Sequence, residues 1–209
     1  MPETYKTVAK EAADEFVEKK SRFIGYAMPV TTEAEALAAV AARKKKFWDA
    51  KHNVWAYTLR SGGARCSDDG EPQGTAGVPV LDVLQKAGIV DCVVVVTRYF
   101  GGVLLGAGGL VRAYSHAASL GVAAATPVLM RPCTVMTVTC DYSRYGGVQG
   151  LLASEGQLGE TAFGEAVTLT VTLPDERVEA TQAALTELSA GQLTLTETDR
   201  IYAAWQAEE

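Results

Sequence analysis

VVVVTRYFGGVLLGAGGLVRAYS, residues 93–115, is the stretch from which the fold can be worked out. It overlaps the segment Val90–Thr97, whose apolar run at 92–96 is of the kind that forms a strand buried on both faces. Glycines then punctuate the chain from Gly101 to Gly109, and small residues continue from there to about Ala125. The stretch therefore predicts a buried strand, a glycine-rich turn and a long helix, in that order.

On the N-terminal side of this stretch, strands and helices alternate. Thr32 and Glu35 have the spacing of a capping box, in which the two residues bond each other's backbone at a helix start. Basic residues gather at 43–46, where positive charge is favourable at a helix C-terminus. Pro79 and Gly88 suit the start and the end of a second helix. We expect strands at 22–30, 54–59 and 64–66, and helices at about 33–46 and 78–87.

The residues after the long helix form a second pattern. Cys133–Tyr142 alternates apolar and polar residues and is rich in Val and Thr, which predicts a strand. Ser143 and Asp175 are residue types that cap helices. The expected order is strand 133–142, helix 143–155, strands 157–163 and 165–173, helix 175–189 and strand 193–202. This βαββαβ order is the split βαβ arrangement of ferredoxin-like domains. Nothing in it has a catalytic pattern, so we interpret it as a binding or spacer module.

The charge of the chain divides between these two patterns. Residues 1–127 hold 15 Lys and Arg against 13 Asp and Glu, whereas residues 128–209 hold 4 against 12. The resulting excess of two positive and of eight negative charges accounts for the net charge of −6. Pro127 follows the small-residue helix and would interrupt it. We therefore predict an α+β protein of two domains, 1–127 and 128–209, each with its own core, and expect any polyanionic partner to meet the first domain.

The composition excludes several classes of protein. With 48% hydrophobic and 21% charged residues, the chain has enough apolar material for packed cores and is not intrinsically disordered. The longest charge-free segment, 113–130, is too polar for a membrane span. Acidic residues among the first sixteen argue against a signal peptide. The four cysteines lack the spacing of a zinc site. These features predict a cytoplasmic protein with reduced thiols and no membrane association.

Two glycine-rich loops, 67–77 and 98–109, each end where a predicted helix begins. Backbone N–H groups at such a helix start are unpaired and attract phosphates and other anions. Arg98 opens the second loop, and Arg112 follows it in the expected first turn of the helix. Neither loop is followed by the Lys-Ser/Thr of a Walker phosphate-binding loop, and glycine also serves where a turn is simply tight. Anion binding and tight turns therefore both remain interpretations of these loops.

The first of these loops is also acidic. Asp68, Asp69 and Glu71 could hold a magnesium ion through their carboxylate oxygens, although Asp-Asp-Gly-Glu-Pro is equally suitable as turn chemistry. No other cofactor is predicted. His52, just before a strand, is a candidate base or phosphate donor, and the alternative is a structural histidine. We expect His52, the acidic loop and residues 98–102 to converge on one face of the N-terminal domain.

Four blocks of the sequence carry a resemblance to a known family. They are KKSRFIGY (19–26), HNVWAY (52–57), RCSDDGEPQGTAG (65–77) and VTRYFGGVLLGAGGLVRAYS (96–115). They resemble the signature blocks of the IMPACT family, specifically its short bacterial members. The resemblance covers about residues 5–125 with high specificity, and the remaining residues resemble the small C-terminal domain of the family.

This resemblance implies a fold for each domain. The N-terminal domain would be similar to the second domain of ribosomal small-subunit protein five, and the C-terminal domain to the last domain of elongation factor G. Eukaryotic members of the family regulate translation by competing for the activator of a starvation-responsive initiation-factor kinase. They use an additional N-terminal domain for part of this, which these 209 residues do not contain. The kinase pathway is therefore not implied here, and the resemblance implies no biochemical activity.

Two functions from different classes follow as hypotheses. The first is a translation-linked binding protein that contacts RNA or the ribosome through the polar and glycine-rich face of the N-terminal domain. The second is a magnesium-dependent enzyme acting on a nucleotide or another phosphorylated small molecule. Candidate residues for binding RNA or a phosphate-bearing ligand are His52, Arg65, Arg98, Tyr99, Gly101, Gly102, Gly108, Gly109 and Arg112, joined by Lys19, Lys20, Arg22 and Phe100. Whether catalysis occurs, and the oligomeric state, are left open by the sequence.

Overall fold

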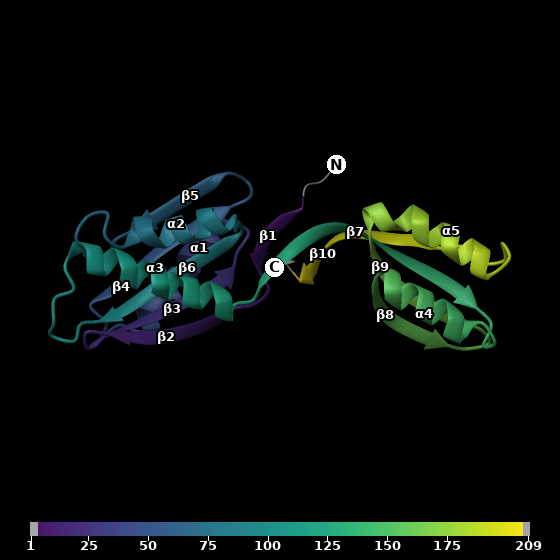
Figure 1. Cartoon of the computed structure of the whole chain (residues 1–209), viewed down its shortest axis with the longest axis horizontal. Helices are drawn as coiled ribbons and strands as arrows, with labels where there is room; N and C mark the ends of the chain where they lie inside the picture. The colour runs from purple at the N-terminus through teal and green to yellow at the C-terminus, as the bar shows by residue number, and fades with distance from the viewer. Residues whose placement is uncertain (1–3, 207–209) are drawn as a thin grey trace. The chain divides into compact units, whose positions relative to one another are not determined.

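The computed structural model describes residues 4–206. It divides into two compact units, residues 5–129 and residues 130–205 (Figure 1). The α+β fold class expected from the sequence is confirmed. The strands of the N-terminal unit are β1 (Tyr5–Val8), β2 (Ala12–Glu18), β3 (Ser21–Pro29), β4 (His52–Leu59), β5 (Gly63–Ser67) and β6 (Cys92–Tyr99), and its helices are α1 (Glu33–Lys46), α2 (Gly77–Ala87) and α3 (Ala107–Ala124).

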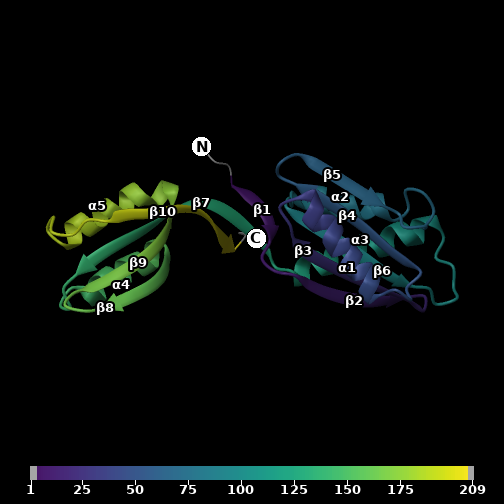
Figure 2. The same cartoon turned by 180° about the vertical axis from the view of Figure 1, so that it is seen from behind.

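The N-terminal unit is a three-layer arrangement built on one antiparallel sheet with strand order β2-β3-β6-β4-β5. Helices α2 and α3 cover one face, and α1 covers the other, as comparison of Figures 1 and 2 shows. The central strand β6 sends Val94 and Val96 into the core beneath α2 and α3, and Val93 and Val95 into the core beneath α1. The unbroken run of valines is therefore explained by burial on both faces.

Helix α3 and strand β3 approach each other closely enough for their backbones to be in contact. A Cβ atom built on Gly25 would lie 1.8 Å from the carbonyl oxygen of Ala117. A Cβ atom on Gly121 would lie 2.7 Å from the carbonyl carbon of Gly25. Only glycine permits this approach at either position. The close packing of β3 and α3 holds the helix on the sheet and places its first turn near the end of β6.

The register of the sheet brings several predicted site residues to one end of it. Arg98, near the end of β6, is paired with His52 at the start of β4 and with Phe23 near the start of β3. Because β6 runs antiparallel to both neighbours, the chain segments before β4, before β3 and after β6 meet at this end. The polar loops expected to converge do so here.

The turn between β2 and β3 also lies at this end. Its two residues, Lys19 and Lys20, have φ values of 44° and 64°, in the left-handed region. The backbone of Lys20 approaches Gly101 so closely that a Cβ atom on Gly101 would lie 2.0 Å from the Lys20 carbonyl. Gly101 therefore serves close packing against this turn. Strands β1 and β2 were not expected from the sequence, because β2 is an edge strand whose residues are mostly exposed and often acidic.

The C-terminal unit has the ferredoxin-like order predicted for it, with β7 at its start. Its elements are β7 (Pro127–Cys140), α4 (Tyr145–Glu155), β8 (Gln157–Phe163), β9 (Val167–Pro174), the 3₁₀ turn η1 (Asp175–Arg177), α5 (Val178–Leu188) and β10 (Thr196–Gln206). Strand β7 is flanked by β9 and β10, and β8 pairs with β9. Apolar residues of β7 and β9 form one core with α4 and α5. Strand β1 also pairs with β7, whose first residues belong to the N-terminal unit.

Two caps expected in the C-terminal unit are not formed. The hydroxyl of Ser143 donates to the carboxylate of Asp141 instead of bonding the start of α4. Asp175 lies in η1, before α5, and its Oδ1 accepts a hydrogen bond of 2.8 Å from the hydroxyl of Thr134. Both expectations were wrong because a nearby side chain offered a better partner. Within residues 4–206, no helix is long and apolar enough to cross a membrane.

Candidate functional site

A cavity of about 410 Å³ opens at the end of the sheet where the polar loops meet. One side is charged and polar, and the other side is made by the loop after β6 and the first turn of α3. Its lining residues are Lys51, His52, Gly70, Glu71, Pro72, Arg98, Phe100, Leu104, Leu105, Gly106, Ala107 and Leu110, and we call it the β6–α3 cavity. The convergence of His52, the acidic loop and the residues after β6 is thereby confirmed.

The charged wall of this cavity is a buried network centred on Glu71. Its Oε1 accepts a hydrogen bond of 2.5 Å from Nη1 of Arg98 and one of 2.8 Å from the hydroxyl of Tyr114. The side chains of Glu71 and Arg98 are only 4% and 6% exposed. Burial, and then the negative charge of Glu71, raises the pKa of Tyr114, so its hydroxyl remains a neutral donor. Arg98, predicted as a free phosphate ligand, is therefore committed mainly to Glu71.

His52 is held beside this network in a defined tautomer. Its Nδ1 lies 2.9 Å from the carbonyl oxygen of Asp69, and because a carbonyl can only accept, Nδ1 carries the proton. Its Nε2 faces Glu71, with 3.7 Å between Nε2 and Oε1. The His52 side chain is 9% exposed and lines the cavity. Both interpretations of His52 thus keep support, since the ring is structurally anchored and also borders a space for a ligand.

An aromatic residue forms the outer wall of the cavity. The Arg98 guanidinium lies between the rings of Phe23 and Phe100, at 5.4 and 5.5 Å from their centroids. Phe100 is 44% exposed, and the ammonium of Lys51 lies 6.0 Å from its centroid. The cavity therefore combines an accessible ring with a cation beside it.

The two helix starts predicted to bind anions differ in structure. At the start of α2, the carboxylate of Asp68 accepts hydrogen bonds from the backbone N–H groups of Gly74, Ala76 and Gly77, so the protein supplies its own anion there. Helix α3 begins after Gly106 without a side-chain cap and without an acidic residue in its first turn. Its start lines the β6–α3 cavity, so only this second helix start offers free N–H donors beside a cavity.

The acidic loop does not form the magnesium site suggested by the sequence. Asp68 bonds the start of α2, and Glu71 turns into the buried network. Asp69 accepts hydrogen bonds from the ammonium of Lys44 and from the backbone N–H of Asn53, at 2.5 and 2.6 Å. Within the described part of the chain, no group of three or more His, Cys, Asp or Glu side chains could hold a metal ion. Each carboxylate stabilises the loop through a different partner.

The role of Asp68 gives a pH-dependent prediction. Burial raises the pKa of Asp68, but its three backbone N–H donors outweigh burial and leave that pKa below the ordinary value. The stabilisation is therefore complete above the unfolded-state pKa of about 4 and is lost as the pH falls through the lower folded-state value. Asp68→Ala is expected to reduce the free energy of unfolding by about 1–2 kcal/mol at pH 7, as for other helix caps.

Urea unfolding at neutral and acidic pH measures this effect. The difference in free energy of unfolding between the wild type and Asp68→Ala should become smaller as the pH falls below about 4. Asp14→Ala is the control, because Asp14 is exposed on β2 and its carboxylate accepts a hydrogen bond from the adjacent backbone N–H of Glu15. A difference for Asp68→Ala that stays constant through the acid range would contradict the capping role.

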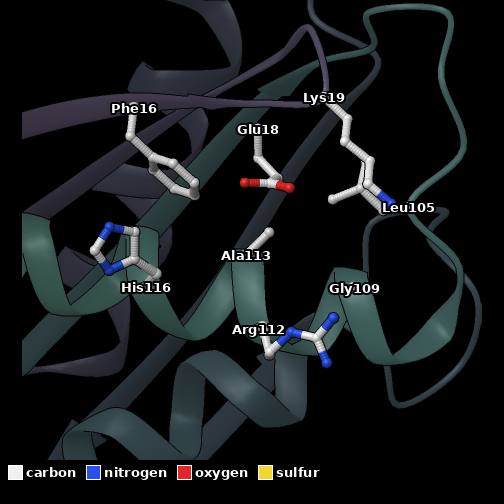
Figure 3. A pocket seen from close by; sticks show the side chains of 8 residues that line it. All are labelled: Phe16, Glu18, Lys19, Leu105, Gly109, Arg112, Ala113 and His116. Atoms are coloured by element: carbon white, nitrogen blue, oxygen red, sulfur yellow. The ribbon is translucent and has the colours of Figure 1, made fainter.

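A second cavity, of about 250 Å³, lies between the end of β2 and helix α3 (Figure 3). Its lining residues are Phe16, Glu18, Lys19, Leu105, Gly109, Arg112, Ala113 and His116, and we call it the β2–α3 cavity. Arg112 lies in the second turn of α3 rather than in the first. Leu105 lines both cavities, but Arg98 lines only the first of them and Arg112 only the second, so these two arginines do not share one site.

The remaining predicted binding residues lie outside both cavities. Arg65 is exposed on β5 and pairs with Glu33. Tyr99 follows Arg98 in β6, faces the other way, and donates a hydrogen bond of 2.8 Å to Asp49. Gly101, Gly102 and Gly108 line neither the β6–α3 cavity nor the β2–α3 cavity. Gly102 has a φ of 83°, which accounts for glycine at that position by turn geometry.

Several residues of the site were missed from the sequence. Tyr114 could have been noticed, because a buried tyrosine hydroxyl needs a partner and this one lies on the buried face of the predicted helix. Lys51 directly precedes His52 and could have been included with it. Glu18, Phe16 and His116 had no local signal, because strand β2 was not expected and their proximity depends on its pairing with β3.

Comparison with known proteins places this architecture in a family. Residues 19–122 match the Impact N-terminal domain, and residues 138–192 match a domain of unknown function, DUF1949. IMPACT family member YvyE of Bacillus subtilis (strain 168) is 38% identical over 205 residues, which cover 97% of this chain and 94% of that protein. IMPACT family member YigZ of Escherichia coli (strain K12) is 36% identical over 182 residues, which cover 85% of this chain and 89% of that protein.

A solved structure is similar over almost the whole chain. It is described as the crystal structure of a hypothetical protein, and it is 32% identical with a TM-score of 0.60, covering 95% of this chain and 99% of that one. The similarity therefore extends through both units. The chain belongs to the IMPACT family, as its four signature blocks indicated.

Proposed function

We propose that this chain is a translation-linked binding protein of the cytoplasm, and that its N-terminal unit holds single-stranded RNA at the β6–α3 cavity. The observation that carries the proposal is the meeting of an accessible aromatic ring, a lysine and an uncapped helix start around one cavity. Membership of the IMPACT family supports the link to translation, since eukaryotic members regulate that process. RNA within a ribosome presents the same chemistry as free RNA.

Each part of the cavity suits one part of a nucleotide. The exposed face of Phe100 can stack on a base, and stacking tolerates any base because each has a π-face. The N–H groups at the start of α3 and the ammonium of Lys51 can bind a phosphate. Gly106 and Ala107 leave the helix start accessible. The volume of about 410 Å³ lies within the range of small-molecule sites and suits one unstacked nucleotide.

Fluorescence anisotropy with a labelled single-stranded oligouridylate tests this proposal. Phe100→Ala is expected to weaken binding about tenfold or more, because stacking contributes roughly 1–3 kcal/mol per base. Lys51→Ala should weaken binding and reduce the slope of log affinity against log salt by about one. Phe163→Ala and Lys86→Ala are matched controls, because Phe163 is 63% exposed in the C-terminal unit and Lys86 is exposed near the end of α2. Equal losses in test and control variants would exclude the cavity as the RNA site.

A second function is favoured by one observation. The Nε2 of His52 is unprotonated in the neutral ring and borders the cavity, as a general base would. The same preparation is therefore screened for hydrolysis of nucleotides and sugar phosphates. Turnover that is present in the wild type and absent in His52→Gln would replace the binding proposal with an enzymatic one.

A further inference from the structure

The β2–α3 cavity brings together charged side chains from two parts of the chain that are distant in sequence. Figure 3 shows Glu18 and Lys19, from the end of β2 and its turn, facing Arg112 and His116 of α3 across the hollow. Phe16, Leu105 and Ala113 make its apolar surface. The ring of His116 packs edge-on against Phe16, with centroids 4.6 Å apart, and thereby fixes one end of the cavity.

The charges around this cavity do not neutralise one another. Within residues 4–206, Glu18, Lys19 and Arg112 take part in none of the ion pairs of the structure, although all three line the same space. The other arginines of the N-terminal unit behave differently. Arg22, Arg60, Arg65 and Arg98 pair with carboxylates, and Arg43 stacks between Tyr26 and Phe47. Arg112 thus lines a cavity with a guanidinium group that forms no ion pair within the described residues.

We propose that the β2–α3 cavity binds a small phosphate monoester that also carries an amine. Arg112 would bind two phosphate oxygens through its planar guanidinium, and Lys19 would add a second positive charge. Glu18 would accept hydrogen bonds from the ligand's ammonium group. The charges of the cavity therefore match those of such a ligand. The two cations of the cavity face the phosphate dianion, and its one carboxylate faces the ammonium group.

The same carboxylate argues against other anions. Glu18 would repel inorganic phosphate or the phosphodiester backbone of a nucleic acid, because neither offers a positive group to it. The volume of about 250 Å³ lies below the usual range for larger ligands, so only a few carbon atoms can separate the two charged groups. The binding proposed here is therefore independent of RNA binding at the β6–α3 cavity.

Isothermal titration calorimetry with O-phosphoethanolamine, inorganic phosphate and ethanolamine tests the proposal on the full-length protein. O-phosphoethanolamine should bind about tenfold more tightly than inorganic phosphate, since a hydrogen bond between charged groups typically provides this much. Arg112→Gln should abolish binding of both. Arg144→Gln, at a partly exposed arginine in the C-terminal unit, is the control and should leave the binding of both unchanged.

Glu18→Gln gives the decisive result because its two expected effects have opposite signs. It should weaken the binding of O-phosphoethanolamine, because the ammonium group of that ligand loses its partner. It should strengthen the binding of inorganic phosphate, because the repulsion between phosphate and the Glu18 carboxylate is removed. Circular dichroism of each variant checks that the fold is retained. Equal affinity of the wild type for the two phosphates, parallel effects of Glu18→Gln on both, or binding that survives Arg112→Gln would each overturn the proposal.

Discussion

Replacing Glu71 with alanine is expected to lower the free energy of unfolding by about 3–5 kcal/mol. The change removes the carboxylate that neutralises Arg98, whose side chain is only 6% exposed, and leaves a buried cation without a counter-ion. It also removes the acceptor for the hydroxyl of Tyr114. Both losses arise in the same buried network, where an unsatisfied polar group is costly. Urea denaturation at pH 7 measures the effect.

Two further variants separate the burial of this pair from the loss of an ion pair as such. Glu33→Ala removes the partner of Arg65, but both side chains are about half exposed or more, so the expected loss of stability is much smaller than for Glu71→Ala. Arg98→Met in the Glu71→Ala background removes the buried cation that has lost its counter-ion, and it should restore part of the lost stability. Similar costs for Glu71→Ala and Glu33→Ala would contradict the buried network.

Replacing Gly25 with alanine is expected to destabilise the N-terminal unit by about 3 kcal/mol or more. The added methyl group would lie 1.8 Å from the carbonyl oxygen of Ala117, which is backbone and cannot rotate away. Helix α3 would have to move off β3, and its core contacts through Tyr114 and Ala118 would loosen with it. A thermal unfolding scan followed by circular dichroism detects the loss.

Gly63→Ala is the matched control for this substitution. Gly63 is also in a strand of the same sheet, but a Cβ atom there would have its nearest neighbour, Leu59 Cδ1, at 4.0 Å. Alanine in a strand is more favourable than glycine by a few tenths to about 1 kcal/mol, so Gly63→Ala should be neutral or slightly stabilising. If Gly25→Ala were equally well tolerated, the backbone contact between β3 and α3 could not be as close as described.

Much of the fold was predictable because local patterns and tertiary packing agree. The valines of β6 are buried on both faces, and the capping box of Thr32 and Glu35 is formed as expected. The C-terminal unit follows the predicted βαββαβ order, with element ends that shift by up to six residues, the largest shift being at the start of β7. Strand β2 was missed because most of its residues are exposed, so no alternation of apolar and polar residues was visible, and strand β1 was missed because it has only four residues.

The location of the candidate site was more predictable than its chemistry. Sequence placed His52, the acidic loop and the residues after β6 on one face, and the pairing of His52 with Arg98 brings this about. The sequence did not show which acidic side chain pairs with which basic side chain or helix start. Asp68 caps α2 and Glu71 neutralises Arg98 because of the path of the loop, which depends on the packing of α2 and α3 on the sheet. Such assignments require tertiary structure.

The position of Leu105 has a thermodynamic consequence. The Leu105 side chain lines both the β6–α3 cavity and the β2–α3 cavity. It also packs on Gly109, where an added Cβ atom would lie 3.0 Å from the Cβ atom of Leu105. A ligand that displaces Leu105 from one cavity must alter the volume of the other. By linkage, the factor by which the first ligand changes the affinity for the second equals the factor by which the second changes the affinity for the first. Titrating either ligand in the presence of the other therefore measures the same coupling, and a smaller side chain at position 105 would reduce it toward unity.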